Sequence, residues 1–99
     1  MTGAPKVYLV CYDIANEKRL PKVYKVMRGY GEPLQYSVFR CVLSDLQLAQ
    51  LKDRLIGIIM PTEDQVLFVP LGSSDSKTAW RAFSLGLPIP EPTRAARVL

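Results

Sequence analysis

Residues 7–14 are VYLVCYDI, and this stretch decides the fold. Residues 7–12 are all aliphatic, aromatic or cysteine, a density typical of a central strand that is buried on both faces. The run stops at Asp13. A carboxylate directly after such a strand either caps the following helix or acts as a ligand at the strand end, and the local pattern leaves both interpretations open.

The segment after this strand predicts a basic, amphipathic helix over residues 18–30. Asn16 is a typical capping residue, and Gly29 and Gly31 supply the stop at the other end. Apolar residues recur at helical spacing along one side: Leu20, Val23 or Tyr24, Met27 and Tyr30. The more polar side carries a row of cations: Lys18, Lys22, Lys25 and Arg28. Such a row is either a solvated face or a ridge that contacts phosphates.

Further along the chain, the sequence predicts two more strand regions and a second helix. Residues 33–43 are strand-like, and a tight turn or bulge near residues 35–37 divides them into two short strands. Ser44 and Gln47 form a capping box that opens the second helix. Residues 64–71 predict the last strand of the core.

The predicted order of strand, helix, two strands, helix and strand is that of an α+β protein with a ferredoxin-like βαββαβ fold. We expect one domain over residues 1–99, with a core at about 7–71 and a C-terminal extension at 72–99. The extension is expected to add a short strand around residues 80–83 and to dock on a partner protomer. If both helices cover one face of the sheet, the bare face packs against a second copy, which predicts a homodimer.

The composition limits the kinds of catalytic site that the chain can form. The chain has 99 residues, a formal net charge of +4, no histidine and two cysteines. The lack of histidine excludes Ser-His-Asp and Cys-His catalysis, and two cysteines are too few for a disulfide scaffold. No signal peptide or membrane-spanning stretch is visible, so we expect a cytoplasmic protein with free thiols. The mild basic excess fits an anionic partner such as nucleic acid.

A metal site at Asp13 would need more than the carboxylate of one chain. Mg²⁺ prefers octahedral oxygen ligands, usually one or two carboxylates together with waters and phosphate oxygens. A twofold axis beside Asp13 would bring two copies of this carboxylate into one site. Composition and spacing alone do not establish such an axis.

Several short motifs occur together in this chain. Tyr12-Asp13-Ile14 ends the first strand, a basic helix and Tyr30-Gly31 follow, and Gln35-Tyr36-Ser37-Val38-Phe39 comes next. Asp64 then opens a strand that ends in Val69-Pro70-Leu71. From about Val7 to Leu71, the chain resembles the CRISPR-associated protein 2 family. It departs from the family at Pro33, where a basic residue is common, and at Arg40, where an acidic residue is common.

The resemblance implies a homodimer in which Asp13 of both protomers is catalytic and holds Mg²⁺. It also implies a basic surface for nucleic acid, for which we expect Lys18, Arg19, Lys22, Lys25 and Arg28. Tyr12, Ser37 and Phe39 match motif positions and are expected to support the site.

The function implied by the resemblance is acquisition of new CRISPR spacers. The dimer would bind foreign double-stranded DNA together with the CRISPR integrase, CRISPR-associated protein 1. A Mg²⁺-dependent endonuclease activity on double-stranded DNA or single-stranded RNA is the enzymatic form of this hypothesis. The alternatives are a structural adaptor without catalysis and a ferredoxin-like regulatory domain that binds a small ligand.

Overall fold

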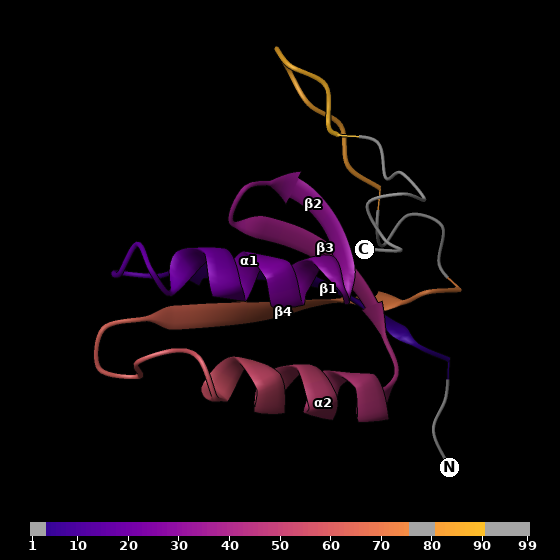
Figure 1. Ribbon diagram of the computed structural model, residues 1–99. Coiled ribbons are helices and arrows are strands. Elements are labelled where there is room, and N and C mark those ends of the chain that lie inside the picture. Colours follow the sequence, from indigo (N-terminus) through magenta and orange to yellow (C-terminus); the bar gives the residue numbers. More distant parts are fainter. Residues whose placement is uncertain (1–3, 76–80, 91–99) are drawn as a thin grey trace.

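The computed structural model describes residues 4–75 and 81–90. Their elements follow the predicted order (Figure 1). The strands are β1 (Lys6–Asp13), β2 (Gly31–Gln35), β3 (Val38–Leu43) and β4 (Gln65–Ser73). The helices are α1 (Leu20–Arg28) and α2 (Asp45–Ile56).

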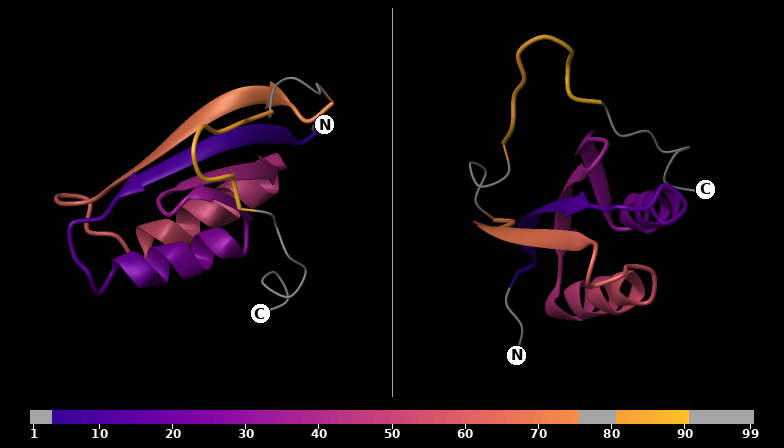
Figure 2. Two further views of the ribbon diagram at one scale, coloured as in Figure 1. Left: turned by 90° about the horizontal axis from the view of Figure 1, so that it is seen from above. Right: turned by 90° about the vertical axis from the view of Figure 1, so that its left-hand side faces the viewer.

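The strands form one antiparallel sheet in the order β2-β3-β1-β4. This order, together with the βαββαβ sequence of elements, is the predicted ferredoxin-like arrangement. Both helices lie on the same side of the sheet, as the view from above shows (Figure 2). Among the described residues, the other face carries no helix, as the sequence predicts. It is not entirely bare, because residues of the 81–89 segment line a cavity there together with Leu9, Val38 and Arg40.

Side chains alternate along β1 between these two faces. Tyr8, Val10 and Tyr12 point into the core, where they meet side chains from β3 and from both helices. Fully buried core residues from the other elements are Val23, Met27, Phe39, Cys41 and Leu51. The intervening β1 residues Leu9 and Cys11 lie on the open face and are only half-buried. Leu9 and Cys11 therefore face a surface that the helices and the rest of the sheet leave partly open, although residues of the 81–89 segment line a cavity beside Leu9.

Helix α1 is shorter than the predicted 18–30. The Asn16 side chain accepts hydrogen bonds from the backbone N–H of Lys18 and Arg19, at 2.8 and 3.2 Å. Asn16 therefore caps as expected, but it caps a turn at residues 17–19, and α1 proper begins at Leu20. The helix ends at Arg28, and Gly29 is its C-cap. Gly31 does not end the helix, because it already belongs to β2.

The β2–β3 hairpin and helix α2 contain the turn and the capping box that the local sequence predicts. A turn at Tyr36 and Ser37 separates β2 from β3, as predicted. Gly31 is required by a close approach, since a Cβ there would lie 2.6 Å from the carbonyl oxygen of Arg40. Both hydrogen bonds of the Ser44–Gln47 capping box are formed at the start of α2.

The additional C-terminal strand is not formed in the described part of the chain. Residues 81–83 adopt no regular structure, and Trp80 lies outside the described residues. Strand propensity needs a hydrogen-bonding partner, and Arg81–Phe83 pair with no strand of this sheet. Phe83, Leu85 and Leu87 are instead 95%, 100% and 88% exposed.

Candidate functional site

Asp13, the predicted catalytic residue, is the last residue of β1. It pairs with Gln65 at the start of β4, and its side chain is exposed. Tyr12 faces the core, so by strand alternation Asp13 projects towards the open face of the sheet. Figure 1 shows that the β1–α1 loop and the β2–β3 turn lie at this same end of the molecule.

Tyr12 fastens the β2–β3 turn to the end of β1. Its hydroxyl donates a hydrogen bond to the carbonyl of Tyr36 at 2.7 Å, and its backbone N–H donates to the carbonyl of Ser37 at 3.1 Å. Burial raises the pKa of the Tyr12 phenol, which therefore stays protonated and keeps donating. Phe39 is fully buried, with its ring centroid 6.2 Å from that of Tyr12. The structure thus brings the three predicted supporting residues, Tyr12, Ser37 and Phe39, together beside the end of β1, where Asp13 lies.

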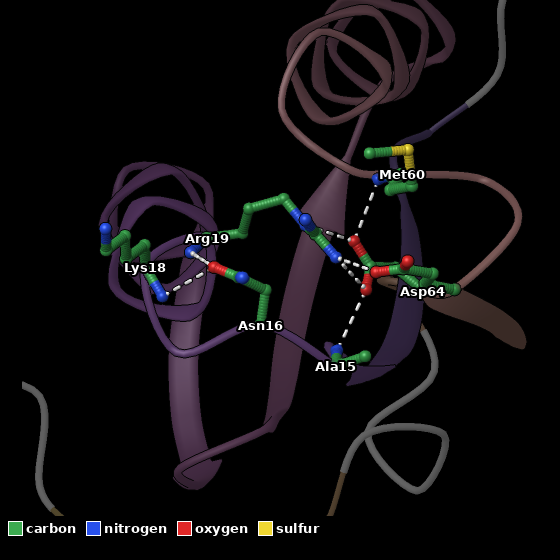
Figure 3. A network of polar contacts seen from close by, with 7 residues as sticks. Ala15, Asn16, Lys18, Arg19, Met60 and Asp64 are labelled. Atoms are coloured by element: carbon green, nitrogen blue, oxygen red, sulfur yellow. Dashed lines mark hydrogen bonds and ion pairs between the residues drawn. The ribbon is translucent and has the colours of Figure 1, made fainter.

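A second carboxylate, Asp64, lies at the same end of the sheet, directly before β4, and Figure 3 shows its polar contacts. Its side chain is 0% exposed. Its oxygens accept hydrogen bonds from the backbone N–H of Ala15 and of Met60, both at 2.8 Å. They also accept from Arg19 Nε at 2.8 Å and Arg19 Nη2 at 3.1 Å. Asp64 therefore ties the loop after Asp13 to the loop before β4.

The charges in this network stabilise one another. Hydrogen bonds from the Arg19 guanidinium, followed by those from the backbone of Met60 and Ala15, hold the pKa of Asp64 well below its usual range, against the opposing effect of burial. The hydrogen bonds that Arg19 donates to Asp64 and to Glu63 raise the pKa of Arg19. Arg19 also donates from Nη2 to Glu63 at 2.9 Å, and its side chain is only 18% exposed. The structure thus gives Arg19 two carboxylate partners, whereas contact with nucleic acid remains a prediction for this residue.

The other predicted nucleic-acid-binding residues follow α1 and the turn before it. Lys18, Lys22 and Lys25 are exposed. Arg28 is half-buried, and its Nη1 donates to the Tyr24 hydroxyl at 3.4 Å. The structure therefore separates the expected cations into three solvated lysines, an arginine in contact with an aromatic ring and an arginine in an ion-pair network.

The sequence pattern places Asp64 at the start of the last strand and does not reveal its role; in the structure, β4 begins one residue later, at Gln65. The one available signal was its position directly before a strand. Its partner Arg19 lies far away in the sequence, and nothing in the spacing of the two residues indicates a pair. The β1–α1 loop and the loop before β4 become neighbours only when β1 and β4 pair.

Within the part of the chain that the structure describes, one protomer does not complete a magnesium site. The described residues hold no group of three or more His, Cys, Asp or Glu side chains that could hold a metal ion. The exposed Asp13 carboxylate is chemically suited to Mg²⁺, but alone it supplies too few ligands. The hypothesis of a magnesium site at Asp13 therefore requires the second copy that the sequence analysis invoked.

Comparison with known proteins gives concordant results. Residues 6–79 match the family described as CRISPR associated protein Cas2. The chain is 47% identical over 64 residues to "CRISPR-associated endoribonuclease Cas2 2" of Thermodesulfovibrio yellowstonii, covering 65% of this chain and 70% of that protein. It is 36% identical over 89 residues to "CRISPR-associated endoribonuclease Cas2 1" of Synechocystis, covering 86% of this chain and 92% of that protein.

A solved structure agrees with these sequence matches. The crystal structure of Streptococcus pyogenes Cas2 superposes with a TM-score of 0.70 and 34% sequence identity, covering 81% of this chain and 99% of that chain. Among the described residues, no helix is long and apolar enough to cross a membrane. The match over residues 6–79 includes β1, its terminal Asp13 and the whole sheet. The chain therefore belongs to the CRISPR associated protein Cas2 family.

Proposed function

We propose that this chain acts in CRISPR adaptation as a homodimer that binds foreign duplex DNA together with the CRISPR integrase, CRISPR-associated protein 1. We further propose that the Asp13 carboxylates of both protomers hold Mg²⁺ and give the dimer an endonuclease activity. One observation carries the proposal: the open, apolar face of the sheet ends at an exposed carboxylate. Two such faces packed about a twofold axis would bring two Asp13 side chains towards a common cleft.

Exposed apolar side chains on the open face support the homodimer. Val42, Leu67 and Leu71 are 48%, 50% and 39% exposed. Full burial of a fully exposed aliphatic side chain stabilises by about 1.5–3 kcal/mol, so covering these partly exposed side chains gives a fraction of that for each and still favours association. The C-terminal segment adds Phe83, Leu85 and Leu87, nearly all of whose surface is in contact with solvent. The predicted docking of this extension on a partner would cover them.

The chemistry of an exposed carboxylate pair supports the metal hypothesis. Mg²⁺ held there would lower the pKa of a bound water and offset charge on the attacked phosphate, chemistry that needs no histidine. This chain contributes a rigid support for Asp13, because the strand end that carries Asp13 and the loop that follows it are both held in place. Pairing with Gln65 holds the residue itself, and the Asp64 bond to Ala15 holds the loop beyond it.

The solvated lysines support binding of a duplex. Lys18, Lys22 and Lys25 are exposed and follow one another along α1 and its entry turn. They also favour the second candidate, an adaptor without catalysis, since duplex binding requires these cations but not Asp13. The name endoribonuclease carried by the relatives favours the nuclease. The small-ligand alternative gains no support from the family assignment. Because its substrate would be intracellular DNA, we expect the protein in the cytoplasm.

Two measurements test the proposal. Light scattering of the purified chain should give the mass of a dimer, and a monomer would remove the basis for the paired Asp13 site. Asp13→Ala should abolish Mg²⁺-dependent cleavage while the dimer and its affinity for duplex DNA persist. A spacer-acquisition assay with the same variant separates the two candidates, because acquisition that persists without cleavage assigns the function to the adaptor.

A further inference from the structure

The β2–β3 turn carries an aromatic side chain that the proposed function does not use. Tyr36 is 55% exposed, although its ring lies against the protein. The ring stacks on Tyr24 of α1 with centroids 4.7 Å apart and an interplanar angle of 14°. Parallel stacking covers one face of the Tyr36 ring, and more than half of the surface of the residue remains open to solvent.

The stack is anchored to the core. Tyr24 meets Phe39 edge-on at 5.5 Å, and Phe39 in turn lies beside Tyr12. The carbonyl of Tyr36 accepts the hydrogen bond from the Tyr12 hydroxyl, which fixes the backbone of the turn. A run of rings therefore leads from the fully buried Phe39 to the surface, and the outermost ring is held before any ligand arrives. Such preorganisation lowers the entropic cost of binding a flat partner.

Positive charge borders this ring stack. Arg28 approaches the Tyr24 ring at 5.8 Å from its centroid and contacts the Tyr24 hydroxyl. Lys25 follows Tyr24 in the helix and is exposed. A flat apolar surface beside cations is complementary to a nucleotide, whose base stacks on a ring while its phosphate meets a cation.

We propose that Tyr36 is a stacking platform for one unpaired nucleobase, and that Arg28, which contacts the neighbouring Tyr24 ring, receives the adjoining phosphate. The inference rests on the nucleic-acid binding of the proposed function and narrows its substrate class. A base inside a duplex has both faces covered by its neighbours, so the platform selects single-stranded segments or the frayed ends of duplexes. Because Tyr12 joins this turn to the end of β1, the stacked nucleotide would lie at the Asp13 end of the sheet.

The test compares the affinities of variants for a labelled single strand of about ten nucleotides and for a blunt duplex of the same length. Tyr36→Ala should weaken single-strand binding by about 5- to 150-fold, the range expected from the loss of one stacked base. Its affinity for the duplex should stay within about twofold, and the dependence of single-strand affinity on salt should not change, because stacking releases no counterions. Tyr36→Phe keeps the ring and should bind like the wild type.

Leu46→Ala is a matched control. Leu46 is 68% exposed on α2, so the variant removes an apolar side chain from another surface and should leave both affinities unchanged. Unchanged single-strand binding by Tyr36→Ala, or equal weakening for strand and duplex, would overturn the platform. So would a change in oligomeric mass, because Tyr36 would then be a protein–protein contact. If the wild type binds duplex but no single strand, the platform fails while the proposed adaptor function stands.

Discussion

Asp13 and Asp64 stand beside the same pair of strands, the first at the end of β1 and the second directly before β4. The Asp13 side chain is exposed to water, whereas the Asp64 side chain is completely covered and accepts bonds from Arg19, Ala15 and Met60. A carboxylate in water keeps its lone pairs available for an incoming ligand. A carboxylate that already accepts several protein donors has none to spare, so it stabilises the loops around it.

The strongest test of this contrast removes each carboxylate and measures thermal unfolding. Asp64→Ala should lower the melting temperature by about 10 °C or more, because Arg19 and two backbone N–H groups lose their acceptor. Asp13→Ala should change it by less than about 3 °C, as expected for an exposed position. An equal drop in melting temperature for Asp64→Ala and Asp13→Ala would contradict the distinction between a structural Asp64 and a functional Asp13.

Glu63→Ala is the matched control for the Arg19 network. Glu63 binds the same guanidinium, but its side chain is 54% exposed. Exposed ion pairs contribute little to stability, so this variant should also melt within about 3 °C of the wild type. A large effect at Glu63 would mean that the charge on Arg19, and not the buried geometry of Asp64, dominates the network.

The pH dependence of stability sharpens the same comparison. Because the folded-state pKa of Asp64 is lowered, its contribution is fully present above the ordinary value of 3.8 and is lost as the pH falls towards the folded value. Denaturant unfolding between about pH 5 and pH 2.5 should therefore show stability that falls with acid. In Asp64→Asn the fall should be shallower, and an identical slope would assign the acid sensitivity to other carboxylates.

The smallest expected effect concerns two cations near the start of α1, of which Arg19 binds Asp64 and Lys22 is exposed. Lys22→Gln should reduce the slope of log affinity for duplex DNA against log salt by about 1, as for the loss of one phosphate contact. Arg19→Gln should leave this slope unchanged, because its guanidinium is bonded to Asp64 and Glu63. Affinity measured from about 50 to 200 mM salt gives both slopes. A reduced slope of log affinity against log salt for Arg19→Gln would show that Arg19 contacts the nucleic acid.

The sequence predicts those parts of the molecule that depend on neighbours along the chain. The dense run at 7–12, the capping box at Ser44 and the turn near Ser37 are local signals, and each element formed where expected. The Arg19–Asp64 pair depends on two loops that meet only after the sheet has formed. The strand expected around residues 80–83 failed in its described part for a related reason, since β propensity does not supply a pairing partner.

Because Cys41 is fully buried in the core, the reactivity of its thiol reports how often the folded protein unfolds. Burial raises the pKa of this thiol to about 12, so the folded chain presents almost no thiolate to an alkylating reagent at neutral pH. Cys11, the other thiol, is half-buried on the open face. Cys41 therefore becomes alkylated only when the core opens. The alkylation rate of this native thiol would measure global unfolding without any engineered label.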